Sequence, residues 1–314
     1  MSEHRQIKKI DMDTLEGAER KVSRGKLRRA GLAVIVFLVV AAGGYAAYRV
    51  IVGEVIASRF TVNRMTCPAC VITVKEVTAK VPGVVEADVS LAAQDVIVKF
   101  REKRTSPDAI RNAIAQAGYP VKPDGLFRPS GAGIDDPVVA GVHGKPVFLR
   151  DIKVPLAVRK TQTGTPDAAA SAFSVIGKEV LLHAADAATI VVQPYEIEEE
   201  VQRIFREQGL SRDEFTVWMT STYGAPEKYY QVVGQRLGIR KLIDEHVLKG
   251  VTDSEARKRK VLEWAGNLFK DADVQVLDPG FKEKLHASAG QDEWKTFWPR
   301  MISRDSELKS LLLQ

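Results

Sequence analysis

The 314-residue chain contains two cysteines, Cys67 and Cys70, in the stretch RMTCPACVITV at residues 64–74. Two thiols at this spacing can hold a metal ion, exchange electrons or close a small disulfide, and the spacing alone leaves all three chemistries open. Thiolates with little else around them suit a soft two-coordinate ion such as Cu(I) or Hg(II). A structural zinc site needs a full tetrahedral set of ligands, and no second Cys or His pair lies nearby. Zinc is therefore disfavoured.

The sequence around the cysteines predicts a small α+β domain. Phe60 and Val62 alternate as in a half-buried strand, and apolar residues recur at helical spacing after Cys70 until the PGV at 82–84. The segments VVEADVSL and DVIVKF then predict a hairpin, and a second helix begins at Ser106 and Pro107 before a short last strand. The predicted order is βαββαβ, the ferredoxin-like arrangement.

This order places the CPAC segment between the first strand and the first helix. The amino end of a helix carries partial positive charge, which lowers the pKa of a thiol placed there. More thiolate is then available to a soft metal.

The same stretch resembles the heavy-metal-associated domain, and within that family the periplasmic mercuric-ion-binding proteins and copper chaperones. The resemblance rests on MTCPAC at 65–70, VPGV at 81–84, the strand pair and AGYP at 117–120, and it covers residues 57–124. It implies that Cys67 and Cys70 are the metal thiolates, with Cu(I) or Hg(II) as the ion and no organic cofactor. It also implies that Met65 supports the loop from the core without being a ligand, and that Tyr119 helps to shield the site. Ordinary core packing is the alternative role for Tyr119.

A thiol-disulfide redox protein is one alternative interpretation of the two cysteines. Thioredoxin-type enzymes also carry such a pair at a helix start, but no flanking Trp or second βαβ unit accompanies it here. An exported domain would meet oxidising conditions, so a reductant is expected to be needed before metal binds.

A basic cluster at residues 20–29 ends where an uncharged apolar run, residues 30–48, begins. At about 1.5 Å per residue this run can cross a hydrocarbon core of about 30 Å. We predict a cytoplasmic basic tail at 1–29 and a single transmembrane helix at 30–52 in the inner membrane, with the C-terminal domains periplasmic or extracellular. A cleaved signal peptide is the alternative. The net charge of +6 is spread along the chain, so no nucleic-acid partner is expected.

Residues 125–136 are rich in Pro, Gly and Asp and predict a linker, and residues 137–314 predict a mainly α-helical domain. GVHGKPVFLRDI and the helical segments after it resemble the N-terminal peptide-binding domain of SurA-type periplasmic chaperones, with His143 where that family tends to have Asn. The resemblance implies polypeptide holding and not prolyl isomerisation, because residues 270–314 are too few for the catalytic parvulin domain. Phe215, Trp218 and Met219 lie at helical spacing and are expected in its core.

No catalytic constellation accompanies these domains, and the five histidines are scattered along the sequence. We therefore expect a membrane-anchored metal-binding protein and not an enzyme, with a metal transporter or a client polypeptide as partner. The alternative is a periplasmic chaperone without isomerase activity whose metal domain is sensory.

Overall fold

The computed structural model describes residues 35, 37–40, 43–44, 53–128, 133–153, 168–280, 283, 302 and 306–313. The chain divides into two compact units, residues 1–54 and 55–314, and the fold below is that of the second. The predicted basic tail lies outside the described residues, as does most of the predicted transmembrane segment. Within the part of the chain that is described, no helix combines the length and apolar character that crossing a membrane requires.

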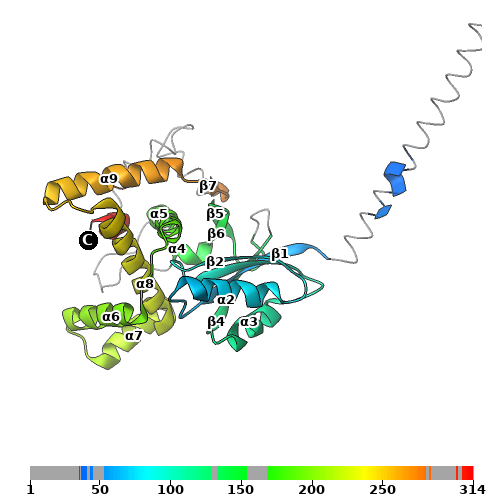
Figure 1. The fold of residues 1–314 in the computed structure, drawn as a ribbon, viewed down its shortest axis with the longest axis horizontal. Coiled ribbons are helices and arrows are strands. Elements are labelled where there is room, and N and C mark those ends of the chain that lie inside the picture. The colour runs from blue at the N-terminus through cyan, green and yellow to red at the C-terminus, as the bar shows by residue number, and fades with distance from the viewer. Residues whose placement is uncertain are drawn as a thin grey trace, which may run out of the picture. The chain divides into compact units, whose positions relative to one another are not determined.

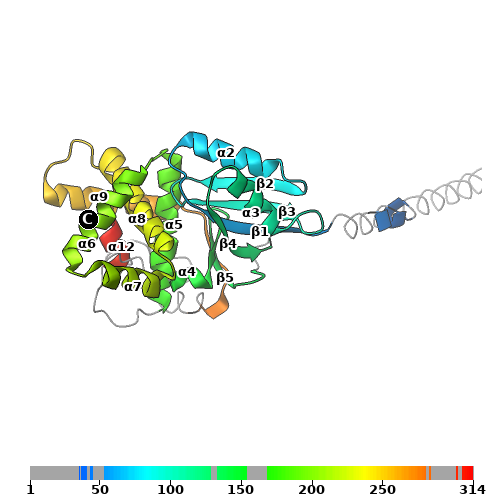
Figure 2. The ribbon, with the colours of Figure 1, turned by 90° about the horizontal axis from the view of Figure 1, so that it is seen from below.

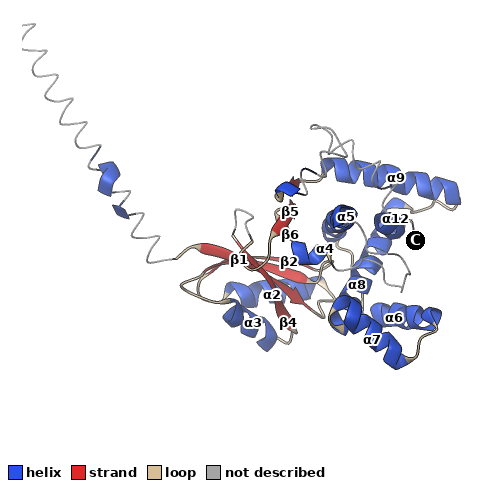
Figure 3. Ribbon diagram, turned by 180° about the vertical axis from the view of Figure 1, so that it is seen from behind, coloured by secondary structure: helices blue, strands red, loops and turns tan. Residues whose placement is uncertain are grey.

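The first part of the second unit is an antiparallel four-stranded sheet with two helices on one face (Figures 1 and 3). Strand β1 in the middle pairs with β3 and β4, and β2 lies at the edge beyond β3. Ile110 and Ile114 of the second helix pack onto this face together with Phe60 and Phe100. The βαββαβ order predicted for residues 57–124 is confirmed by β1 (Val55–Val62), α2 (Pro68–Ala79), β2 (Val84–Ser90), β3 (Asp95–Arg101), α3 (Pro107–Gln116) and β4 (Val121–Phe127).

The second part begins with a hairpin and is then mainly helical, as predicted. The hairpin strands β5 and β6 join β7 in a three-stranded sheet with the order β6-β5-β7. Helices α5, α8 and α12 pack against one another (Figure 2). The elements are β5 (Val138–Val142), β6 (Lys145–Phe148), α4 (Leu149–Ile152), α5 (Ala168–Ala187), α6 (Pro194–Gln208), α7 (Arg212–Tyr223), α8 (Pro226–Leu242), the π-helical turn Ile243–Val247, α9 (Ser254–Asp271), β7 (Val274–Val276) and α12 (Ser306–Leu312).

Local signals in the sequence set several of these helix ends. Gly209 ends α6 in the left-handed conformation, with a φ of 63°, and Ser211 and Glu214 form the capping box that begins α7. Phe215 and Met219 are buried in the core between α6, α7 and α8, as their spacing predicted.

The predicted linker at 125–136 is wrong at its start, because Gly125–Phe127 belong to β4. Gly125 has a φ of +140°, and a Cβ at this position would lie 2.4 Å from Cζ of Phe148. Only glycine lets β4 pass so close to that ring. The glycine that suggested a linker is therefore required by a close contact inside strand β4.

The sheet face opposite α2 and α3 is covered by the second part of the chain. Ala57, Ile97 and Phe127 of the sheet pack there against Val138 and Phe148. We call this contact the domain interface. The sequence suggested two domains joined by a linker, whereas residues 55–314 form one compact unit.

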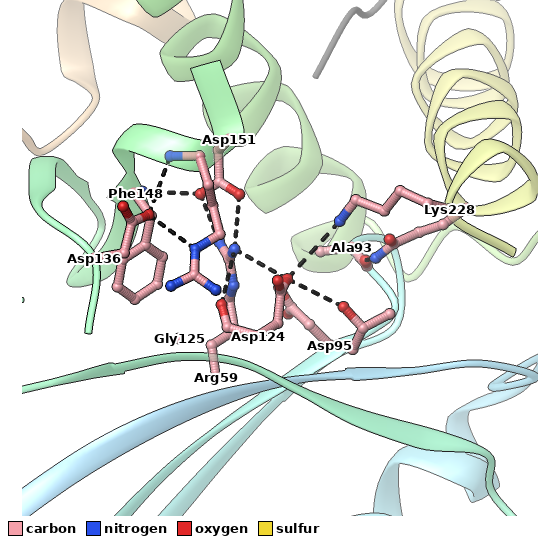
Figure 4. A network of polar contacts seen from close by, with 12 residues as sticks. Arg59, Ala93, Asp95, Asp124, Gly125, Asp136, Phe148, Asp151 and Lys228 are labelled. Carbon is pink, nitrogen blue, oxygen red and sulfur yellow. Dashed lines mark hydrogen bonds and ion pairs between the residues drawn. The ribbon is translucent and has the colours of Figure 1, made fainter. Parts of the chain in front are cut away.

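Buried charges cross the domain interface (Figure 4). Arg59 on β1 is 5% exposed and forms ion pairs with Asp124 at 3.0 Å and Asp151 at 2.7 Å. Its guanidinium also lies 4.8 Å from the centre of the Phe148 ring. Burial of Asp151 disfavours its charged form, but the charge and hydrogen bonds of Arg59 lower its pKa to about 2. This carboxylate is therefore ionised at neutral pH and holds α4 against the sheet.

A second buried pairing crosses the same interface between other elements. Nζ of Lys145 on β6 lies 2.8 Å from a carboxylate oxygen of Asp95 on β3 and 3.2 Å from one of Glu179 on α5. The sheet and the helical part are thus joined by charge as well as by apolar contact.

Candidate metal centre

The two cysteines lie at the start of α2, where the βαββαβ order placed them. Cys67 is the N-cap residue, Pro68 follows in the first turn, and the amide of Cys70 donates to the carbonyl of Cys67 at 3.0 Å. The Cys67 side chain makes no capping hydrogen bond to the helix, so its sulfur stays available. The two Sγ atoms are 2.8 Å apart, and both thiols are free and half-buried. The fold therefore aims both sulfurs at one point near the protein surface.

Met65 lies in the core beneath this loop and is 1% exposed. It packs in the apolar cluster formed by the sheet and α3. Its burial leaves its sulfur turned into the core, where the resemblance placed it, and fixes the loop that leads into α2.

Tyr119 is half-buried beside the site, and its side chain forms a hydrogen bond with the Cys70 thiol. Burial and this bond raise the pKa of Tyr119, so the phenol stays protonated and donates to the sulfur. The ring also packs against the core of the domain. Tyr119 therefore packs against the core and contacts Cys70, and its shielding of a bound ion stays a prediction.

The surroundings of Cys70 favour its thiolate. Burial raises its pKa, but hydrogen bonds with the Cys67 thiol, the backbone of Thr66 and the Tyr119 side chain outweigh burial and lower the pKa to about 7. A larger share of Cys70 than of an ordinary cysteine is therefore thiolate at neutral pH. Less proton release is then needed for a soft metal ion to bind this ligand.

We expect the Cys70 thiol of the reduced chain to titrate near pH 7, with thiolate above this pH and thiol below it. Replacing Tyr119 with Phe removes a donor to the thiolate and should move the midpoint upward, toward the value of about 8.5 of a free cysteine. The Cβ chemical shift of Cys70 followed by NMR against pH measures both midpoints. A wild-type midpoint near 8.5, or one that Tyr119→Phe leaves unchanged, would contradict this assignment.

One site-supporting residue, Gln94, was missed at the sequence level. Its Oε1 accepts from the Met65 amide at 3.2 Å, and its Nε2 donates to the Met65 carbonyl. Its backbone is left-handed, with a φ of 56°. Nothing in the sequence marks this turn position as a partner of a residue 29 positions away.

The histidines are less scattered than the sequence suggested. His143 in the β5–β6 turn stacks on His183 of α5, with ring centres 3.9 Å apart and planes 11° apart. Burial and the proximity of His183 lower the pKa of His143, despite the opposing charge of Asp273. Over the described ranges, no group of three or more His, Cys, Asp and Glu side chains is arranged to hold a metal.

A cleft of about 560 Å³ lies beside the metal-binding loop. The loop before the cysteines forms one wall, and α6 and α8 form the other. Its lining includes Met65, Thr66, Gln94, Ile197, Tyr230 and Gln231. The loop that carries the cysteines therefore faces the helical part of the same chain.

Residues 59–120, which contain the two cysteines and Tyr119, match the family model of the heavy-metal-associated domain. These residues form a heavy-metal-associated domain. Its βαββαβ fold and its thiol pair at the start of the first helix agree with the resemblance seen in the sequence.

Relatives of the heavy-metal-associated domain include mercuric transport proteins. The mercuric transport protein periplasmic component of Pseudomonas fluorescens is 42% identical over 60 residues, which are 19% of this chain and 66% of that protein. The corresponding protein of Shigella flexneri is 43% identical over 56 residues, 18% of this chain and 62% of that protein. The chain thus spans just under two thirds of the length of these relatives.

Solved structures also align with this domain. Oxidized MerP from Ralstonia metallidurans CH34 has 38% sequence identity and a TM-score of 0.21, over 22% of this chain and 94% of that one. A copper binding domain from HMA7, a P-type ATPase, has 27% identity and a TM-score of 0.22, over 23% of this chain and 96% of that one.

Proposed function

We propose that this chain captures a soft metal ion, Cu(I) or Hg(II), between the thiolates of Cys67 and Cys70. The observation that carries the proposal is the pair of free thiols, 2.8 Å apart at the start of α2, inside a heavy-metal-associated domain. Its relatedness to mercuric transport proteins supports the choice of a soft ion. The protein acts as a binding protein and not as an enzyme, because capture and release require only ligand exchange at two sulfurs.

The chemistry of the site fits this role. Two sulfurs near the surface can take an ion from another thiol carrier by stepwise exchange. One sulfur binds the ion first, and the other then displaces the thiol of the carrier. Hydrogen bonds from Cys67, Thr66 and Tyr119 lower the pKa of Cys70 and so favour its thiolate, and the buried Met65 keeps the loop in place. Together these residues offer a preformed, partly charged pair to the incoming ion.

The location and partner form the wider part of the proposal. The uncharged run within residues 30–52 would anchor the chain in the inner membrane as a single-pass protein with the metal domain in the periplasm. The helical part would bind a polypeptide, either a metal transporter that receives the ion or a client protein. The cleft beside the metal-binding loop supports a docking role, because apolar side chains of α6 and α8 such as Ile197 and Tyr230 line it.

Titration of the reduced full chain in detergent, without oxygen, tests the metal site. We expect one equivalent of Hg²⁺ or Cu⁺ to bind, with sulfur-only coordination in the X-ray absorption spectrum, and Zn²⁺ to bind much more weakly. A chain with Cys67→Ser and Cys70→Ser should bind none at the same ion concentration. Equal binding by this double variant, or absence of binding by the wild type, would overturn the proposal.

A thiol-disulfide redox function is the second candidate, favoured by the pKa of about 7 of Cys70. Such a protein would reduce a disulfide in a model substrate, and bound metal would inhibit it. Measuring the rate of insulin reduction by the reduced chain, with the double serine variant as control, separates the two functions. A wild-type rate no greater than that of the variant excludes the redox function.

A further inference from the structure

The turn between β2 and β3 connects the metal-binding loop to the helical part of the chain. Gln94 at its end holds both backbone groups of Met65 through its side-chain amide, and its own carbonyl accepts from the amide of Val62 at 2.9 Å. Met65 lies two positions before Cys67. Gln94 thus holds the end of β1 and the residue that leads into the metal-binding loop.

The same turn is held on its other side by helices far away in the sequence. The carbonyl of Ala93 accepts from Nε2 of Gln231 at 2.9 Å and from Nε2 of Gln235 at 3.0 Å, both on α8. The amide of Ala92 donates to Asp186 of α5 at 2.8 Å. Ala93, Gln231 and Gln235 are 1%, 7% and 6% exposed, so these bonds are made away from water, where an unmet polar group is most costly.

The contacts around the β2–β3 turn impose a strained backbone conformation on Gln94. A φ of +56° favours Gly or Asn, and Gln adopts it only when the surrounding contacts outweigh the strain. The Gln94 side chain supplies such contacts by bonding to Met65 and to the Leu91 carbonyl at 2.9 Å. A shorter or apolar side chain at this position would keep the strain and lose the bonds.

We propose that Gln94 is a positioning residue of the metal site, and that it transmits the docking of the β2–β3 turn on α8 to the loop that carries Cys67 and Cys70. The inference rests on the proposed soft-metal function and assigns part of the metal affinity to residues of the helical domain. In the intact chain, Gln231 and Gln235 hold the turn, the turn holds Gln94, and Gln94 holds Met65. Metal that orders the loop strengthens the same docking in return, because coupling between two equilibria is reciprocal.

The test compares four full-length chains: wild type, Gln94→Ala, the double variant Gln231→Ala with Gln235→Ala, and the control Gln202→Ala. Gln202 on α6 is half-buried, and among the described contacts of its side chain it donates only to Glu198. Two quantities test the proposal, and a third serves as the reference. Hydrogen exchange at the Met65 amide reports loop order without metal, and competition with a dithiol chelator gives the affinity for Hg²⁺. Exchange at Val98, in the central strand β3, reports the stability of the sheet.

We expect Gln94→Ala to speed exchange at Met65 by about tenfold, the equivalent of one lost hydrogen bond, while exchange at Val98 stays within about twofold. Its Hg²⁺ affinity should fall by about 10–100-fold, as for other residues that orient metal ligands. The α8 double variant should move both quantities in the same direction by a smaller factor, and Gln202→Ala should move neither.

Two results would overturn the inference: unchanged Met65 exchange in the α8 double variant, or equal acceleration at Met65 and Val98, which indicates a merely structural role. The double variant keeps the test decisive if Gln94→Ala fails to fold. Absence of Hg²⁺ binding by the wild type would instead refute the proposed function. The exchange data, recorded without metal, would then still decide whether α8 orders the loop.

Discussion

Replacing Asp151 with Ala is expected to lower the free energy of unfolding by about 3–5 kcal/mol, the usual effect of removing one partner of a buried ion pair. Asp151 accepts from Nη1 of Arg59 at 2.9 Å and from Nη2 at 2.7 Å, and Arg59 is almost inaccessible to water. Without this carboxylate, the guanidinium keeps Asp124 alone as a carboxylate hydrogen-bond partner. The amide of Phe148, which donates to Asp151 at 2.8 Å, loses its acceptor as well. Urea unfolding of the full chain followed by circular dichroism measures the change.

Glu86→Ala provides the matched control for Asp151→Ala. Glu86 on β2 pairs with Lys99 at 2.8 Å, but the two side chains are 58% and 40% exposed. Exposed pairs contribute about 0–1 kcal/mol because water and salt screen them. Similar losses in the two variants would show that the domain interface does not depend on the buried charges, and would contradict the interpretation of residues 55–314 as one cooperative unit.

Single replacement of either cysteine is expected to lower the affinity for Hg²⁺ by more than about 100-fold. This bound follows because even residues that only orient metal ligands contribute about 10–100-fold. Serine preserves the size of the side chain, but its hard oxygen is a poor ligand for a soft ion. Both Cys67→Ser and Cys70→Ser should show the loss, since a two-coordinate ion needs both sulfurs. Competition with a dithiol chelator under reducing conditions measures each affinity.

Two further variants provide reference affinities for the cysteine variants. Ile72 lies on α2 close to the cysteines and is 58% exposed, so Ile72→Ala should leave the affinity unchanged. Tyr119→Phe keeps the ring and removes its hydrogen bond to Cys70, and should give an intermediate loss. Retention of wild-type affinity by one of the two serine variants would mean that a single sulfur holds the ion, and the paired site would have to be abandoned.

Local patterns in the sequence determined most of the metal-binding domain and some helix ends of the helical part. Ser106 with Pro107 begins α3, the Ser211 and Glu214 pair begins α7, and the alternation around Phe60 predicts β1. These signals can be read from the sequence because they involve neighbours a few positions apart. The spacing of Cys67 and Cys70 is also a local signal, because two cysteines three positions apart at a helix start place their sulfurs side by side.

The tertiary structure alone decided how the two halves of the chain depend on each other. Arg59 meets Asp151 across 92 positions, and Gln231 meets Ala93 across 138. Neither Arg59 on a strand nor Gln94 in a turn carries a local signal of its partner. The residues next to a polar side chain in the sequence do not show whether it is exposed or belongs to a buried network. The sequence by itself determined that two thiols begin a helix in a βαββαβ domain. Only long-range packing decided that the helical half of the chain buries the opposite face of that sheet and, through the β2–β3 turn, reaches the loop that carries the thiols.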